Sequence, residues 1–202
     1  FDPPTGLTRL FAQRVSQASM TQRAGRAGRL EPGICLHLIA KEQAERAAAQ
    51  SEPEILQSDL SGLLMELLQW GCSDPAQMSW LDQPPAVNLQ AAKRLLRMLG
   101  ALDGERLSAQ GQKMAALGND PRLTALLASA KSEARAPPAA KIAAILEEPP
   151  RMGNSDLGVA FSRNQPAWQQ RSQQLLKRLN VRGGEADSSL IAPLLAGAYA
   201  DR

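Results

Sequence analysis

The chain has 202 residues, of which 44% are hydrophobic and 21% are charged. This is enough apolar material for one large core or for several small ones. Only 3% of the residues are aromatic, so a core must be built from leucine, alanine, isoleucine and valine, which favours packed helices over a β-sandwich. The formal net charge of +3 suits a polyanionic partner but is too small to exclude other partners.

The first 50 residues are expected to be the end of an α/β domain. Pro3, Pro4, Thr5 and Gly6 predict a turn, and the loose alternation after them predicts a hairpin whose return strand covers residues 7–15. A short helix is expected at residues 21–28, with Ser16 and Ser19 both able to cap it. The apolar run 34–40 predicts a strand buried on both faces, as in a parallel sheet.

Residues 51–118 have the order helix, helix, small hairpin, helix, which is typical of a winged-helix unit. Gly71 and Gly100 are expected to end the first two helices. Asp103 and Gly104 predict the tight hairpin turn, and Ser108 can cap the third helix. The first helix is expected to carry one aliphatic stripe made of Ile55, Leu56, Leu60, Leu63, Leu64, Leu67 and Leu68.

The rest of the chain is predicted to contain only helices. Asp120 as a cap and Pro121 at the first helical position predict a clean helix start. The expected helices cover residues 121–134, 138–147, 164–180 and 188–202. The predicted fold is therefore mainly α with a small α/β part.

Cysteine usage and hydropathy limit the class of protein. Cys35 and Cys72 have no CxxC spacing, so they are expected to be small core residues in a reducing, cytoplasmic compartment, and no metal site is predicted. His37 interrupts the longest apolar run and is also expected to be a core or sheet-end residue. No membrane span and no signal peptide are predicted. The chain begins with Phe1, and we expect it to be an internal piece of a longer protein.

The stretch TQRAGRAGR at residues 21–29 carries the clearest chemical signal. On a helix with about 100° per residue, Gln22, Arg26 and Arg29 fall within about 60° of one another, while Arg23 projects to the side. Two guanidinium groups and an amide on one face suit a phosphoryl group. The spacing also fits a basic loop or an ordinary surface, or a capping box in which Gln22 only completes the helix start after Ser19.

The same residues resemble a known family. QRAGRAGR at residues 22–29 is identical to motif VI of the DEAH-type superfamily 2 helicases. FDPPTGL and SQAS before it, and PEILQSDLSGLLMELLQWG, LLRMLGALDGERLSAQGQKMA and DPRLTALL after it, resemble the corresponding regions of that family in order and spacing. The resemblance covers residues 1 to about 130 well and the remainder less specifically, and a bacterial member of the family looks most similar.

The resemblance implies an ATP-dependent RNA helicase. Residues 1–50 would be the C-terminal end of the second RecA-like domain, residues 51–118 a winged helix, and residues 119–202 an incomplete helical, ratchet-like domain. Arg26 and Arg29 would be arginine fingers that reach the γ-phosphate of ATP, and Gln22 would help to position that phosphate or the attacking water. These three residues are the expected catalytic and ATP-contacting groups.

ATP and Mg²⁺ would be bound mainly by residues upstream of this chain. The sequence contains neither G-x-x-x-x-G-K-[ST] nor Asp-Glu-x-His, the motifs that cradle the phosphates and the magnesium ion in such enzymes. The chain is therefore expected to be inactive alone. Its expected partners are the upstream RecA-like domains of the same protein and RNA or another single-stranded nucleic acid, with no membrane partner.

Candidate nucleic-acid contacts are less specific. The resemblance places Thr5 and Arg9 in a hairpin beside the RNA path. Arg171, Lys177 and Arg178 lie on a predicted helix opposite its apolar side, as a solvated face or as a polar wall for phosphates. The candidate recognition helix 109–117 is poor in basic residues, which favours an architectural winged helix. A non-catalytic nucleic-acid-binding module is the alternative function, and a helical interaction scaffold is a third.

Overall fold

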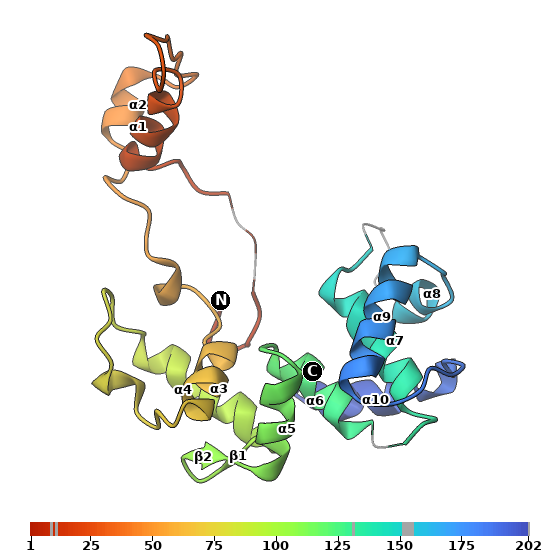
Figure 1. Cartoon of the computed structure of the whole chain (residues 1–202). Coiled ribbons are helices and arrows are strands. Elements are labelled where there is room, and N and C mark those ends of the chain that lie inside the picture. Colours follow the sequence, from red (N-terminus) through yellow and green to blue (C-terminus); the bar gives the residue numbers. More distant parts are fainter. Residues whose placement is uncertain (9, 11, 131, 151–155, 202) are drawn as a thin grey trace. The chain divides into compact units, whose positions relative to one another are not determined.

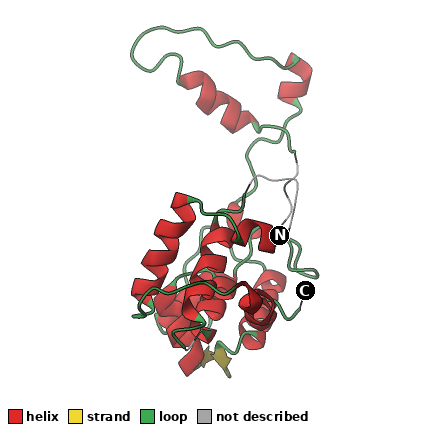
Figure 2. Ribbon diagram, turned by 90° about the vertical axis from the view of Figure 1, so that its right-hand side faces the viewer, coloured by secondary structure: helices red, strands yellow, loops and turns green. Residues whose placement is uncertain are grey.

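The computed structural model describes residues 1–202 except 9, 11, 131, 151–155 and 202. Most of the chain is helical, and the sheet of the described residues has two strands (Figure 2), so the predicted mainly-α fold is confirmed. The chain divides into two compact units, Phe1–Asp59 with Trp80–Pro85, and Leu60–Ser79 with Ala86–Arg202. In the described part, no helix has the length and hydropathy needed to cross a membrane.

The first unit is held together by contacts at the start of α1 (Gln17–Gly25). The backbone N–H of Gln17 donates to the carbonyl oxygen of Ala48 at 2.9 Å, and its side-chain amide donates to the carbonyl oxygens of Glu45 and Ala47. Ser16 is buried and its Oγ lies 3.1 Å from Oγ of Ser51. These bonds join the start of α1 to the end of α2 (Lys41–Glu45) and the residues that follow it, and both helices can be found in Figure 1. A short 3₁₀ helix, η1 (Glu54–Leu56), follows.

The predicted hairpin at the N-terminus forms only its turn. Asp2 and Leu7 form an isolated antiparallel bridge, and Gly6 takes the positive φ of 64° that the turn requires. Among the described residues of 7–15, no strand follows, so the predicted return strand is wrong. A strand needs a neighbour to receive its backbone hydrogen bonds, and the turn alone does not supply one.

The predicted buried strand at residues 34–40 is also wrong. Ile34, Leu36 and Leu38 are exposed by 88%, 82% and 101%, and Cys35 and His37 are exposed as well, which corrects the expectation that these two are core residues. A central parallel strand gains its burial and its hydrogen bonds from flanking strands and covering helices. The described residues provide no such neighbours for this segment, so its apolar side chains stay in solvent.

The second unit begins with the predicted order of helix, helix, hairpin and helix. Its helices are α3 (Ser61–Gln69), the 3₁₀ helix η2 (Pro75–Gln77), α4 (Ala86–Met98) and α5 (Ala109–Leu117). Strands β1 (Leu102–Asp103) and β2 (Arg106–Leu107) pair antiparallel around Gly104, which has φ of 59°. The expected aliphatic stripe is divided between η1 and α3, because the polar pair Ser58 and Asp59 favours a turn over a helix interior.

Close backbone packing joins α5 to the hairpin. Ser108 caps α5 by accepting a hydrogen bond from the N–H of Gly111 at 2.9 Å. A Cβ atom at Gly111 would overlap the carbonyl oxygen and carbon of Ala101. Glycine is therefore required where the first turn of α5 crosses the start of the hairpin.

Replacing Gly111 with alanine is expected to lower the free energy of unfolding by about 1–3 kcal/mol, since the backbones must separate to admit a methyl group. The matched control is Gly197→Ala, which also lies in a helix but has no atom within 4 Å of its added Cβ. The control should be neutral or stabilising, by up to about 1 kcal/mol. Urea denaturation of the two variants measures the difference, and equal stabilities would contradict the packing argument.

The C-terminal part of the second unit is a helical bundle. Its helices are α6 (Pro121–Ser129), α7 (Ala136–Glu147), α8 (Leu157–Phe161), α9 (Pro166–Arg178), the 3₁₀ helix η3 (Ser188–Leu190) and α10 (Ile191–Ala198). Helix α7 is central, and α6, α8, α9 and α10 pack against it. The bundle core consists of buried aliphatic residues with Phe161 and Trp168. The prediction that this part is helical is confirmed, although α9 begins at Pro166 and α8 forms a separate helix before it.

Arg122 closes the bundle by joining its first helix to its last. The guanidinium group donates to both carboxylate oxygens of Asp201 at 2.7 Å and to the carbonyl oxygen of Ala198 at 2.9 Å. It also lies 5.1 Å from the ring centre of Tyr199. These hydrogen bonds and the contact with the ring join the C-terminal end of α10 to the N-terminal turn of α6. They add to the packing between the two helices.

Candidate functional site

The arginine-rich segment lies at the C-terminal end of α1. Gln22 is within the helix, and Arg26 is its C-cap with φ of −69° and ψ of −28°, so these two residues are one helical turn apart. Arg29 lies beyond the helix, in a bend. The expected helical placement of Arg29 is therefore wrong. Gly25 and Gly28 account for the early end, since each glycine weakens a helix interior by about 1 kcal/mol relative to alanine.

A tight loop follows the helix and fixes the backbone around Arg29. A Cβ atom at Gly33 would overlap the carbonyl oxygen of Ala27. The backbone at residue 33 thus lies against the backbone at residue 27, and only glycine permits this approach. The loop returns the chain to the end of α1, so Arg29 stays near the helix terminus although it is not helical.

The capping-box explanation of Gln22 does not hold. The N-cap of α1 is Ser16, whose Oγ accepts a hydrogen bond from the N–H of Ser19 at 3.3 Å. Gln22 is therefore well inside the helix and does not complete its start. Gln22, Arg26 and Arg29 are all exposed. Over the described ranges, none of their side chains has a hydrogen bond or an ion pair with the protein.

Arg23 belongs to a different surface of α1, as predicted. It lines a cavity of about 500 Å³ together with Arg14, Met20 and the segment 35–39. Gln22, Arg26 and Arg29 do not line this cavity. Gln22, Arg26 and Arg29 are therefore exposed to solvent, whereas Arg23 lies beside the apolar segment 35–39.

The predicted nucleic-acid residues of the bundle are mostly engaged within the protein. Arg171 forms a paired contact with both carboxylate oxygens of Glu147, at 2.5 and 2.7 Å, and the hydrogen bond to Glu147 raises the pKa of Arg171. Arg178 donates to the carbonyl oxygen of Leu117 at 3.0 Å. Lys177 is exposed and, within the residues that the structure covers, has no bonded partner. Arg171 thus joins α9 to α7, and Arg178 joins α9 to the end of α5.

The two N-terminal nucleic-acid candidates receive little support. The hydroxyl of Thr5 donates to the carboxylate of Asp2 inside the first turn, so it has a local structural role. Arg9 lies outside the described residues. Thr5 and Arg9 therefore stay predictions as nucleic-acid contacts.

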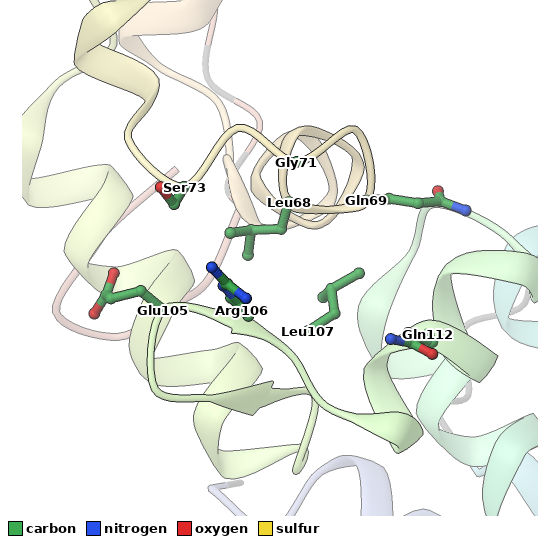
Figure 3. A pocket seen from close by; sticks show the side chains of 8 residues that line it. All are labelled: Leu68, Gln69, Gly71, Ser73, Glu105, Arg106, Leu107 and Gln112. Carbon is green, nitrogen blue, oxygen red and sulfur yellow. The ribbon is translucent and has the colours of Figure 1, made fainter.

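The candidate recognition helix α5 buries Gly111 and Met114 against its own unit and exposes Ala109, Gln112, Lys113 and Ala116. It packs against α3, α6 and β2. Its Gln112 lines a cavity of about 510 Å³ beside Leu68, Arg106 and Leu107, which Figure 3 shows. The exposed face of α5 carries Lys113 as its basic residue, and the architectural role of this helix stays a prediction.

Ion pairs fix the tip of the hairpin to α4. The carboxylate of Glu105 contacts the ammonium of Lys93 and the guanidinium of Arg97 at 2.5 and 3.0 Å. The hydrogen bond from Lys93, together with the charges of Lys93 and Arg97, lowers the pKa of Glu105. A depressed pKa means that the contact stabilises the fold above the ordinary carboxyl pKa and ceases to do so as acid protonates Glu105.

We therefore expect wild type to melt at a higher temperature than Glu105→Gln at neutral pH, and this advantage to disappear as the pH falls below about 4, near the ordinary glutamate pKa. The effect should be small because Glu105 is exposed, and it should shrink in high salt. Thermal unfolding of both proteins across the acid range provides the measurement. An advantage that persists after full protonation would show that the ion pair is not its cause.

Comparisons with known proteins give close matches. The chain is 91% identical over all 202 residues to the ATP-dependent RNA helicase HrpB of Escherichia coli strain K12, and covers 25% of that protein. It is 37% identical over 129 residues, or 63% of its length, to the pre-mRNA-splicing factor ATP-dependent RNA helicase prp22 of Schizosaccharomyces pombe, and covers 11% of that protein.

Two solved structures also match the chain over its whole length. A crystal structure of the Escherichia coli DEAH/RHA helicase HrpB matches the whole chain with a TM-score of 0.94 and 91% identity, and the chain covers 26% of it. A second HrpB crystal structure, described as a DExH-box NTPase, matches with a TM-score of 0.89. No protein-family model matches the chain. The chain spans about a quarter of the length of HrpB, to which it is similar along its full length.

Proposed function

Because the chain belongs, as a segment, to the DEAH/RHA helicase family, we propose that it supplies the arginine fingers and the auxiliary domains of an ATP-dependent RNA helicase. The proposal is supported mainly by the exposure of three side chains in the arginine segment, residues 21–29. Gln22, Arg26 and Arg29 are exposed and unpaired within the described part of the chain, and they match the helicase motif residue by residue.

Arg26 and Arg29 would contact the γ-phosphate of ATP. A guanidinium group keeps its charge and donates paired hydrogen bonds to phosphoryl oxygens. In the transition state of phosphoryl transfer, negative charge spreads over these oxygens, and arginine stabilises it. Gln22, one turn before Arg26, would donate or accept a hydrogen bond that orients the phosphate or the attacking water.

The remaining ATP contacts and Mg²⁺ would come from upstream residues. In the portion of the chain that the structure covers, no three His, Cys, Asp or Glu side chains are grouped so that they could hold a metal ion. The sequence also lacks the phosphate-loop pattern. The residues present therefore fit a phosphate group but not a magnesium ion, so this chain would contribute one side of a composite site.

The proposed domains explain the exposed apolar segment. Residues 1–50 would end the second RecA-like domain, whose other strands would cover Ile34, Leu36 and Leu38 in the longer protein. Residues 51–118 would form an architectural winged helix, and residues 119–202 part of a helical domain that contacts single-stranded nucleic acid. Motion driven by ATP would pass through the packing of α5 and α6.

The proposal is tested with the full-length protein and an RNA duplex that carries a single-stranded extension. We expect strand separation with ATP and Mg²⁺, and none with a non-hydrolysable ATP analogue. Binding of the duplex without any ATP-dependent separation or RNA-stimulated hydrolysis would favour a non-catalytic binding module instead.

A further inference from the structure

A cavity of about 430 Å³ lies on the bundle between α7, α9 and the segment 183–186. Its floor is apolar and is formed by Pro137, the buried residues Trp168 and Leu176, and Ala186. Trp168 is fixed in place, because its indole N–H donates to the carbonyl oxygen of Glu148 at 3.0 Å. The cavity floor thus includes an aromatic side chain that is held in the core and is 3% exposed.

One side of the cavity is a row of amides along α9. Gln165, Gln169 and Gln173 are spaced by four residues and all line the cavity, with Ser172 beside them. At about 100° per residue these side chains share one face of the helix. Each amide offers a carbonyl acceptor and an NH₂ donor, so the row can match the mixed donor and acceptor pattern of a polar heterocycle.

The charge of the cavity lining is positive. Lys141 and Arg163 line it, and no carboxylate does among the residues that the structure describes. The ammonium of Lys141 is held 4.6 Å from the ring centre of Phe161. The guanidinium of Arg163 is exposed and, over the described ranges, has no side-chain partner. Two cations without compensating acids favour an anionic ligand.

From this combination we infer that the cavity binds a nucleotide, with Arg163 and Lys141 on its phosphate and the α9 amides on the edge of its base. A nucleotide joins a phosphate, a flat apolar face and a polar edge, which are the three chemistries that the cavity offers. The inference rests on the proposed function only in that single-stranded RNA is one source of such a nucleotide. A free mononucleotide is the other source.

The cavity lies on a different side of α9 from the arginines predicted earlier. Arg171 and Arg178 are bonded to Glu147 and to the backbone of Leu117, and neither lines the cavity. A ligand that contacts Arg163 would therefore meet free donors, and Lys141, which lies over the ring of Phe161, has no carboxylate partner among the described residues.

The test measures binding of a labelled single-stranded oligoribonucleotide, and of uridine monophosphate, to the full-length protein. We expect Arg163→Gln and Lys141→Gln to weaken binding about tenfold, and Gln169→Ala to weaken it less. For the oligonucleotide, each charge variant should lower the slope of log affinity against log salt by about 0.7, the value for one phosphate of a single strand.

Matched controls separate the cavity from a general charge effect. Arg94→Gln removes an exposed arginine on α4, and Gln170→Ala removes a glutamine of α9 that does not line the cavity. Both should bind as wild type does, and melting temperatures check that every variant is folded. Loss of oligonucleotide binding alone would identify the strand as the ligand, and loss for both probes would identify a site that also accepts free nucleotides.

Two results would overturn the inference. One is wild-type affinity and salt slope for both probes in Arg163→Gln and Gln169→Ala. The other is an equal loss in Lys177→Gln, which would assign binding to the outer face of α9. If these variants bind normally while the protein still unwinds RNA with ATP, only this inference fails. If they lose binding but wild type neither hydrolyses ATP nor unwinds, only the proposed function fails.

Discussion

Replacing Arg26 or Arg29 with alanine in the full-length protein is expected to lower the rate of RNA-stimulated ATP hydrolysis at least about a thousandfold, within the range found for arginine fingers. The reason is that each guanidinium would stabilise charge that develops on the transferred phosphoryl group. RNA affinity should change little, because in this account neither side chain contacts RNA. Steady-state phosphate release with saturating RNA measures the effect.

Two further variants sharpen this prediction. Arg23→Ala removes an arginine of the same segment that lines a separate cavity, and it should retain far more activity than Arg26→Ala. Arg26→Lys keeps the positive charge but loses the paired donors, so it should not restore full turnover. If Arg26→Ala and Arg29→Ala both hydrolyse ATP at the wild-type rate, the finger role is wrong, whatever the resemblance of the segment.

Replacing Leu126 with alanine is expected to destabilise the second unit by about 2–5 kcal/mol, the usual cost of a large-to-small change in a core. Leu126 is fully buried on α6, and α6 packs against α3, α5, α7 and α10. The cavity left by the lost side chain would therefore weaken both the part of the second unit before α6 and the bundle. Urea denaturation followed by far-ultraviolet circular dichroism measures the change.

Leu81→Ala is the matched control for this variant. Leu81 is fully exposed in a loop of the first unit, so the same chemical change should alter stability by no more than about 0.5 kcal/mol. Comparable losses in the two variants would contradict the burial that the structure assigns to α6. If only part of the helical circular dichroism signal of Leu126→Ala is lost at lower urea, the bundle and the part of the second unit before α6 unfold separately.

The elements that the sequence predicted well are those with local signals. Asp120 caps α6 by accepting from the N–H groups of Arg122 and Leu123, and Pro121 starts the helix, as expected. Ser108 caps α5, and Gly104 forms the hairpin turn. Each of these features depends on a few neighbouring residues, so the sequence alone is sufficient to identify it.

Features that depend on distant partners were predicted poorly. The apolar pattern at residues 34–40 is that of a buried strand, but hydrophobic periodicity does not state whether neighbouring strands are present. Arg29 was placed on a continuous helix because side-chain spacing was counted without the cost of Gly25 and Gly28. The basic residues of α9 are predicted to form a solvated face or a wall for phosphates, and their spacing does not indicate that Arg171 and Arg178 bond to partners far away in the sequence.

For the candidate site, the sequence predicted that Arg23 lies on a different side of α1 from Gln22 and Arg26, but not where the helix ends. The cavity of the bundle was missed. Its signal was present in the sequence as glutamines at residues 165, 169 and 173. The cations that complete it are Lys141 on α7 and Arg163, the second residue after α8, and only the folded bundle brings them to that face.

In the function proposed above, this chain holds one side of an ATP site whose other side lies upstream. We would test this most directly by comparing the rate of RNA-stimulated ATP hydrolysis by the isolated 202-residue chain with the rate for the full-length protein under identical conditions. We expect turnover by the full-length protein and none by the isolated chain. Two results would contradict the composite ATP site. One is ATP hydrolysis by the purified chain alone, and the other is no ATP hydrolysis by a folded full-length protein that binds RNA.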